Sequence, residues 1–161
     1  MESSETEARL EGGCVCGKVR YRLSSPPMIV HCCHCTQCRR RVGTAFALNA
    51  LIEADRVELL SGSPACVTLP TESGRPLDDW ACPSCKTSLW SDYGRRRNLL
   101  FGRVGTLDDP AALPPDVHIF VRSKLPWVEL PKGARAYKVY YDAKEVWTSQ
   151  ALERRAALRT A

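Results

Sequence analysis

Residues 31–46 read H-C-C-H-C-T-Q-C-R-R-R-V-G-T-A-F and contain a C-x-C-x-x-C group formed by Cys33, Cys35 and Cys38. Two residues between thiols let a tight turn point both sulfurs at one metal ion, and a C-x-C pair does the same where an extended chain enters a turn. Three protein ligands with a fourth position left to water or substrate are typical of catalytic zinc. The spacing therefore predicts a metal site that is open on one side.

Two further cysteine pairs lie on either side of this group in the sequence. Cys14 and Cys16 form a C-x-C, and Cys82 and Cys85 form a C-x-x-C. A C-x-C and a C-x-x-C together can supply the four sulfurs of a closed structural zinc site. Spacing alone leaves open which groups share a metal. Thiolate-rich sites favour zinc, although iron–sulfur clusters and copper also use thiolates.

The remaining cysteines and the histidines are predicted to be structural. Cys32 adjoins a candidate ligand, and neighbours on an extended chain point in opposite directions, so we predict a buried thiol there. We predict the same for Cys66, which lies in a strand-like run. By the same alternation, His34 should point away from a metal held by its neighbours, whereas His31 and His118 belong to strand-like runs.

Length and composition indicate one globular domain. The chain has 161 residues, of which 44% are hydrophobic and 25% charged, so it is neither membrane-like nor disordered. No apolar run approaches the roughly 18 residues of a transmembrane helix. The acidic start predicts a disordered leader over residues 1–8 and a cytoplasmic location, with a nuclear one left open. In a reducing compartment nine cysteines indicate metal ligands rather than disulfides.

The positive charge is concentrated near the C-terminus. The formal net charge is +5, and residues 132–161 carry seven basic and three acidic side chains. A nucleic-acid-binding domain usually shows a basic stripe on its folded body. We therefore expect a basic C-terminal extension over 132–161 and no nucleic-acid partner.

Short strand-like runs separated by Gly, Pro and Ser clusters predict a mainly β domain of short antiparallel strands. The candidate strands are Lys18–Leu23, Thr44–Ala50, Arg56–Leu60, Ala65–Leu69, Leu99–Val104 and Val117–Val121. A short turn or helix is expected over Thr36–Arg41. A second helix is expected over Lys144–Leu158, which is rich in helix formers.

We expect this C-terminal helix to pack loosely on the body or to form a contact in a homo-oligomer. Leu152, Ala156 and Arg159 share one of its faces, which makes it only modestly amphipathic.

Four segments resemble the glutathione-dependent formaldehyde-activating enzyme family, which includes centromere protein V. They are G-G-C-V-C-G-K-V-R-Y (12–21), the segment 31–46 quoted above, A-C-P-S-C-K-T-S-L-W (81–90) and H-I-F-V-R-S-K-L-P-W-V-E-L (118–130). They occur in the family's order and delimit a domain over residues 9–131. One departure is Lys86, which stands where the family commonly has glycine.

The resemblance implies a single zinc-stapled β-tent domain with two zinc ions per chain. It assigns Cys14, Cys16, Cys82 and Cys85 to a structural zinc. It assigns Cys33, Cys35 and Cys38 to a second zinc that lies next to the substrate.

The resemblance also implies a carbon–sulfur lyase reaction that joins glutathione and formaldehyde as S-(hydroxymethyl)glutathione. A zinc-bound thiol loses its proton, and the thiolate is the nucleophile. Three thiolates make the site electronegative, so we favour thiol binding over strong activation of the aldehyde. Because glutathione carries two carboxylates, Arg39 is the leading candidate for substrate binding. Trp127 is a second candidate, as a wall of the pocket.

Two other functions remain open from the sequence. A non-catalytic zinc module could bind a protein or chromatin partner, as the centromere branch of the family suggests. A thiol-redox role for Cys82 and Cys85 is disfavoured because the resemblance gives both a structural task.

Overall fold

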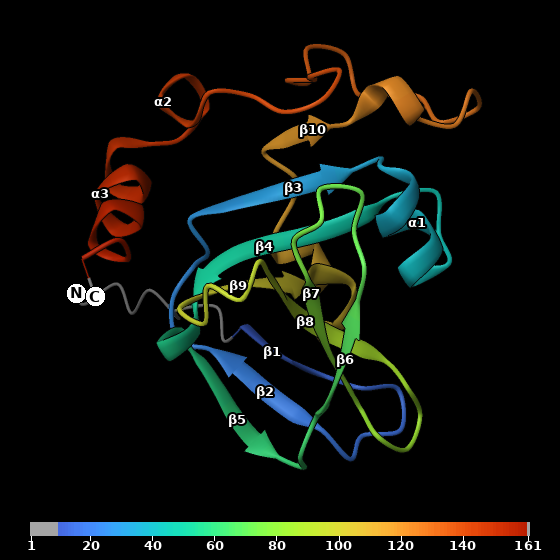
Figure 1. The fold of residues 1–161 in the computed structure, drawn as a ribbon, viewed down its shortest axis with the longest axis vertical. Coiled ribbons are helices and arrows are strands. Elements are labelled where there is room, and N and C mark those ends of the chain that lie inside the picture. The colour runs from blue at the N-terminus through green and yellow to red at the C-terminus, as the bar shows by residue number, and fades with distance from the viewer. Residues whose placement is uncertain (1–9, 161) are drawn as a thin grey trace, which may run out of the picture.

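The computed structural model describes residues 10–160, so the leader expected over 1–8 lies outside the described residues. Within this range the chain forms ten strands in two sheets, with short helices after β3 and near the C-terminus (Figure 1). The predicted mainly β fold is therefore confirmed. No helix in the described range has the length and apolar character needed to cross a bilayer.

The smaller sheet contains the N-terminal strands. Its order is β1 (Leu10–Gly13), β2 (Arg20–Leu23) and β5 (Val57–Ser61), and both pairings are antiparallel. Tyr21 is buried between less buried arginines, as expected for a strand with one face on the core. A Cβ on Gly12 would lie only 2.5 Å from the Thr106 carbonyl oxygen, so glycine is required there.

The larger sheet has seven strands in the order β10-β3-β4-β9-β8-β7-β6. Its strands are β3 (Ile29–Cys33), β4 (Ala47–Glu53), β6 (Ala65–Leu69), β7 (Leu77–Ala81), β8 (Ser88–Tyr93), β9 (Leu99–Arg103) and β10 (Val117–Ile119). Every pairing is antiparallel except that of β10 with β3, which is parallel. This one parallel pairing brings the segment after residue 116 beside the three-cysteine segment.

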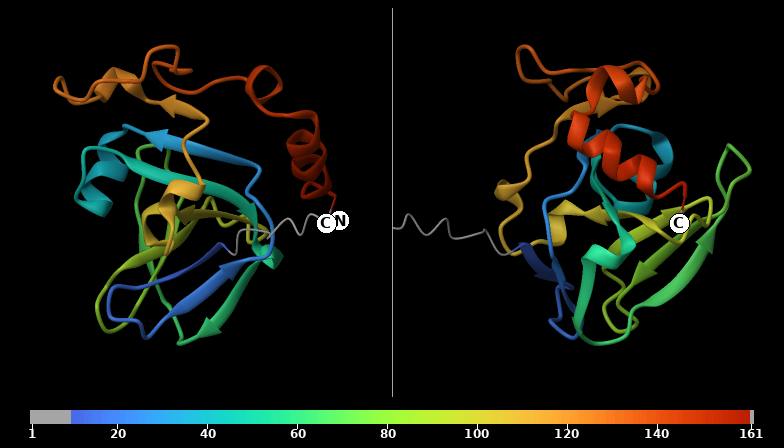
Figure 2. Two further views of the ribbon diagram at one scale, coloured as in Figure 1. Left: turned by 180° about the vertical axis from the view of Figure 1, so that it is seen from behind. Right: turned by 90° about the vertical axis from the view of Figure 1, so that its left-hand side faces the viewer.

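Two apolar clusters form the core. One lies between the sheets and includes Tyr21, Ile52 and Leu89, all of which are fully buried. The other lies between the larger sheet and the C-terminal segment and includes Val117 and Trp147. Figure 2 shows this C-terminal segment passing along one end of the larger sheet.

The helices are short and capped by side chains. Helix α1 (Thr36–Val42) directly follows β3, with Cys35 as its N-cap and Gly43 as its left-handed C-cap. Near the C-terminus, α2 (Ala143–Val146) and α3 (Ser149–Ala157) have Asp142 and Thr148 as N-caps. Single 3₁₀ turns occur at Ala54–Arg56, Val104–Thr106, Pro110–Ala112 and Val121–Ser123.

The prediction for the C-terminal helix was wrong in one respect. The helix is broken at Trp147 and Thr148, because the indole of Trp147 is buried and Thr148 caps a new helix. On the face shared by Leu152, Ala156 and Arg159, the last two are exposed, whereas Ala151 is buried. The segment contacts the body mainly through Val146, Trp147 and Ala151, which are buried in the second apolar cluster.

One of the two predictions for unassigned thiols was also wrong. Cys32 is buried, as expected, but Cys66 is exposed. Cys66 lies on β6, an edge strand of the larger sheet, and four of the five residues of β6 are exposed. Edge position, rather than strand-like composition, decides the exposure of this thiol.

Candidate metal centres and substrate site

The first and last cysteine pairs meet in space. Cys14 and Cys16 lie in the turn after β1, and Cys82 and Cys85 lie in the turn between β7 and β8; we call them the four-cysteine group. Their sulfurs lie within 4.8 Å of one another, with 3.5 Å between Cys14 and Cys16 and 3.8 Å between Cys16 and Cys82. Sulfurs at the corners of a tetrahedral zinc site are about 3.8 Å apart, given zinc–sulfur bonds of about 2.3 Å. The donor set therefore fits zinc.

The two turns also stabilise charged sulfur. The Val19 amide donates to the Cys14 sulfur at 3.3 Å. Hydrogen bonds from the side chain and backbone of Thr87 lower the pKa of Cys85 to about 5. Because a metal ligand must be a thiolate, these donors favour metal binding.

The three-cysteine group consists of Cys33, Cys35 and Cys38. Cys33 ends β3, Cys35 caps α1 and Cys38 lies in the first turn of α1, so one strand-to-helix junction brings all three together. Their sulfurs lie within 4.8 Å of one another. In the described part of the chain, no fourth Cys, His, Asp or Glu ligand atom joins this group.

The charges of these three thiols are unequal. Hydrogen bonds from the Cys33 and Cys38 side chains lower the pKa of Cys35 to about 2, and the same contact with Cys35 raises the pKa of Cys33. The Cys38 amide also donates to the Cys35 sulfur at 3.2 Å. Without a cation the group thus favours one thiolate solvated by two thiols. A divalent cation would be needed to ionise all three.

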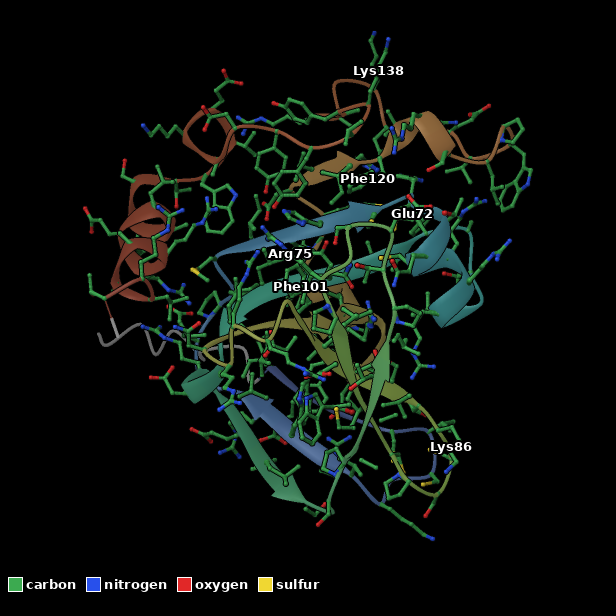
Figure 3. The ribbon with its side chains drawn as sticks, viewed as in Figure 1. Glu72, Arg75, Lys86, Phe101, Phe120 and Lys138 are labelled. Carbon is green, nitrogen blue, oxygen red and sulfur yellow. The ribbon has the colours of Figure 1, made fainter. Side chains whose placement is uncertain are left out.

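The three cysteines of this group belong to the second apolar cluster. Phe101 and Phe120 pack in the same apolar cluster as its cysteines, and Figure 3 shows both far along the molecule from Lys86, which follows Cys85. The two cysteine groups therefore occupy different regions. The hydrogen bond with Cys33 and the positive charge of Arg103 act to lower the pKa of Cys38, but the contact with Cys35, burial and the charge of Cys35 outweigh them and raise this pKa to about 11.

The two candidate substrate residues differ in their surroundings. Arg39 lies on α1, and its buried Nε atom has no hydrogen-bond partner within the described chain. Trp127 has 71% of its surface exposed, so it does not pack in the core.

Two cavities lie outside the cysteine groups. One, of about 650 Å³, is lined by residues that follow both groups, including Phe46 and the cationic side chains Arg41, Lys86 and Arg103. Two of these arginines contact the fully buried Asp79. The single carboxylate of Asp79 does not neutralise the three cationic side chains, so this cavity is suited to an anion.

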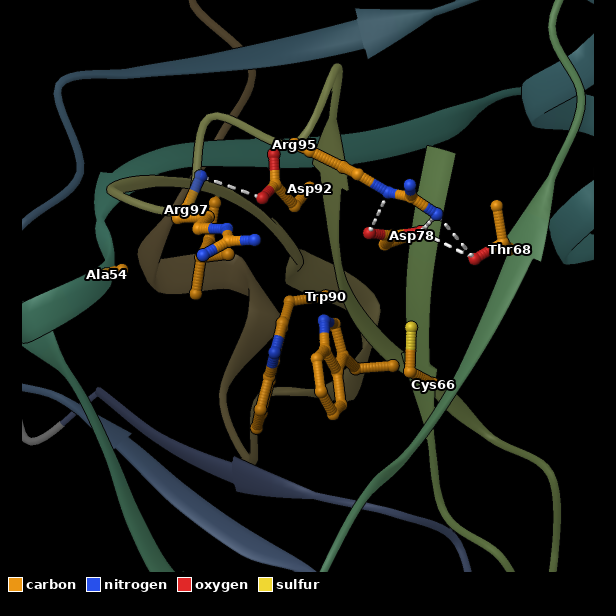
Figure 4. A pocket seen from close by; sticks show the side chains of 10 residues that line it. Ala54, Cys66, Thr68, Asp78, Trp90, Asp92, Arg95 and Arg97 are labelled. Atoms are coloured by element: carbon orange, nitrogen blue, oxygen red, sulfur yellow. Dashed lines mark hydrogen bonds and ion pairs between the residues drawn. The ribbon is translucent and has the colours of Figure 1, made fainter. Parts of the chain in front are cut away.

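The second cavity has a volume of about 560 Å³ and lies over β6, β7 and β8. Figure 4 shows Trp90 at its centre and the Arg95 guanidinium bonded to Asp78 and Thr68. The exposed Cys66 also lines it. None of the seven cysteines in the two groups lines this cavity.

The structure also brings together Cys32, His34 and His118, which we call the histidine cluster. His34 was predicted to point away from the metal ligands. Its ring is fully buried, and its Nε2 atom lies 3.1 Å from the Nδ1 atom of His118. Burial, and then the positive charges of His118, Lys124 and Arg39, lower the pKa of His34 to about 4. Alternation along the chain could have shown that residues 32 and 34 lie on the same side. The sequence could not have shown that β10 pairs with β3 and brings His118 to them.

The model of the family "Glutathione-dependent formaldehyde-activating enzyme" matches residues 9–123. The chain belongs to this family. A Halomonas elongata protein named "Putative glutathione-dependent formaldehyde-activating enzyme" is 30% identical over 126 residues, which cover 75% of this chain and 80% of the relative. A Rhodobacter sphaeroides protein of known crystal structure aligns with a TM-score of 0.45 and 17% identity, over 79% of this chain and 98% of that one.

Family membership agrees with the resemblance read from the cysteine motifs. The matched region contains all seven cysteines of the two groups and both histidines of the histidine cluster. It ends before Trp127, so the family model does not extend to that candidate.

Proposed function

We propose that this chain is a zinc-dependent carbon–sulfur lyase-type enzyme that joins a thiol of the glutathione class to a small aldehyde such as formaldehyde. The observation that carries the proposal is the convergence of three sulfurs from Cys33, Cys35 and Cys38 with no fourth ligand atom in the described residues. Three thiolate donors suit zinc and leave a position for an incoming thiol.

The reaction forms one bond and moves one proton. The substrate sulfur bonds to the carbonyl carbon, the π electron pair moves to the oxygen, and the proton lost by the thiol ends on that oxygen. Bound zinc would supply a lowered pKa for a thiol at the open position. The chain itself supplies three sulfurs held at one strand-to-helix junction, next to the apolar cluster that includes Phe120.

Substrate orientation is assigned to cations on and near α1. Arg39 is proposed to bind a substrate carboxylate, because its buried Nε atom lacks a partner and a guanidinium can bind a carboxylate with two hydrogen bonds. Arg41, Lys86 and Arg103 line the 650 Å³ cavity and can attract the second carboxylate. Trp127, which is exposed, is proposed to cover the bound thiol.

The four-cysteine group is proposed to hold a structural zinc that links the two sheets. Cys14 and Cys16 follow β1 of the smaller sheet, whereas Cys82 and Cys85 follow β7 of the larger one. We further propose that residues 9–131 form the zinc domain, that 132–161 form an extension packed against it, and that the enzyme is cytoplasmic.

Native mass spectrometry with and without glutathione tests the proposal. The wild-type protein is expected to bind one glutathione per chain, and Cys35→Ser is expected to lose both one zinc ion and this binding while remaining folded. Cys66→Ser is the matched control, since Cys66 is exposed and belongs to neither group. Glutathione binding that survives Cys35→Ser unchanged would overturn the proposed site.

A further inference from the structure

Cys32, His34 and His118 form a third set of converging ligand atoms, distinct from both cysteine groups. Alternation along β3 directs residues 32 and 34 away from Cys33 and Cys35. The parallel pairing of β10 with β3 places His118 opposite Cys32. No role for this cluster follows from the proposed reaction.

The spacing of the three atoms fits one metal ion. The His34 Nε2 atom lies 3.1 Å from His118 Nδ1 and 3.5 Å from the Cys32 sulfur. Zinc bonds of about 2.0–2.1 Å to nitrogen and 2.3 Å to sulfur, at tetrahedral angles, place ligand nitrogens about 3.3 Å apart and nitrogen and sulfur about 3.6 Å apart. The observed separations therefore match those expected around zinc.

One ring nitrogen of His34 serves both polar contacts in this cluster. The three side chains are 1%, 0% and 8% exposed for Cys32, His34 and His118, so water does not reach most of the cluster. The single Nε2 atom of His34 faces both partners, and it carries at most one proton to share between them. One cation would instead accept a lone pair from each of the three atoms.

We propose that Cys32, His34 and His118 form a third metal site, with two nitrogen ligands and one sulfur ligand, that binds Zn²⁺. Imidazole nitrogen and cysteine thiolate are both zinc ligands, and zinc sites commonly combine the two. Binding releases the Cys32 thiol proton to solvent, because the ligand is the thiolate.

The surroundings of His34 predict that this third ion is the most weakly held. A metal-bound histidine usually donates its other N–H to an acceptor, and the loss of such a partner lowers metal affinity about 10–100-fold. The buried Nδ1 atom of His34 has no partner in the described chain. A chelator is therefore expected to remove this ion before those of the two cysteine groups.

Zinc quantification and zinc X-ray absorption of the full, zinc-loaded chain test the site. Since the two cysteine groups contain no histidine, any outer-shell scattering from imidazole rings reports the histidine cluster alone. We expect this signal together with three zinc ions per chain. The first chelator equivalent should remove both the signal and one ion.

Two variants and a control complete the test. Cys32→Ala and His118→Gln should each lose one zinc ion and the imidazole signal but keep two ions, whereas Cys66→Ala should keep all three. If either variant fails to fold, the wild-type absorption spectrum decides. A wild-type protein with two zinc ions and no imidazole scattering would overturn the proposal. Loss of glutathione binding would not overturn it, because glutathione binding is assigned to the three-cysteine group.

Discussion

At the scale of single residues, the backbone conformation of Lys86 explains why glycine suits this position. Lys86 follows Cys85 with a φ of 65°, and its amide donates to the Cys82 carbonyl at 2.9 Å to close the turn. This left-handed conformation costs about 1–2 kcal/mol for a residue with a Cβ. Gly17 has the same place after Cys16, with a φ of 76°.

Lys86→Gly is therefore expected to stabilise the zinc-loaded protein by about 1 kcal/mol, because glycine adopts this conformation without strain. Thermal unfolding of the loaded protein measures the change. Gly17→Ala is the matched variant and should destabilise the protein by a similar amount. Nothing lies within 4 Å of the added Cβ, so the positive φ angle is the only source of strain. Equal stability of Lys86→Gly and wild type would refute this account.

At the scale of elements, some strands were predicted from the sequence and others were missed. β2 and β5 were found with boundaries shifted by one or two residues, because part of each run alternates. β3 was missed because all five of its residues are buried, so its sequence has no alternation. β7 was missed because it carries Asp78 and Asp79, and strand propensity disfavours aspartate.

The buried Asp79 shows how tertiary contacts override propensity. Its carboxylate contacts Arg103 at 3.3 Å, Arg41, and the Ser88 hydroxyl at 2.8 Å. These partners come from β9, α1 and β8, and they meet only after the sheet has formed.

The packing of α3 on β4 depends on an ion pair between Arg154 and Glu53, whose closest atoms are 2.5 Å apart. Burial opposes ionisation of Glu53, but the Arg154 hydrogen bonds outweigh burial and lower its pKa. Arg154→Met should destabilise by about 2–3 kcal/mol at pH 7, since it leaves a buried carboxylate without its main partner. Urea unfolding measures the loss.

The pH dependence of this ion pair follows from the sign of the shift. A lowered pKa stabilises the fold above the unfolded value near 4.5, and this contribution disappears as the pH falls through the folded pKa. The stability gap between wild type and Arg154→Met should therefore narrow below about pH 4.5. Arg159→Met, at an exposed position in the turn that follows α3, should be neutral. A gap independent of pH would contradict the ion-pair explanation.

At the scale of the whole molecule, the two cysteine groups are expected to respond differently to substitution. Cys82→Ser should unfold or aggregate the protein, because the four-cysteine group links a turn of each sheet. Cys16 and Cys82, which meet in this group, are 66 residues apart in the sequence. Cys38→Ser should keep the fold and lose about one zinc ion together with glutathione binding. Circular dichroism and zinc content distinguish the two results. A folded, fully loaded Cys82→Ser variant would contradict the structural role.

The sequence by itself determined the local cysteine turns, because thiols two or three residues apart are brought together by the turn that contains them. Family motifs then determined the grouping of the cysteines. Only the tertiary structure decided the exposure of Cys66, the break between the C-terminal helices at Trp147 and the meeting of His118 with Cys32 and His34. These features depend on which strand pairs with which, and strand pairing joins distant residues that no local pattern connects.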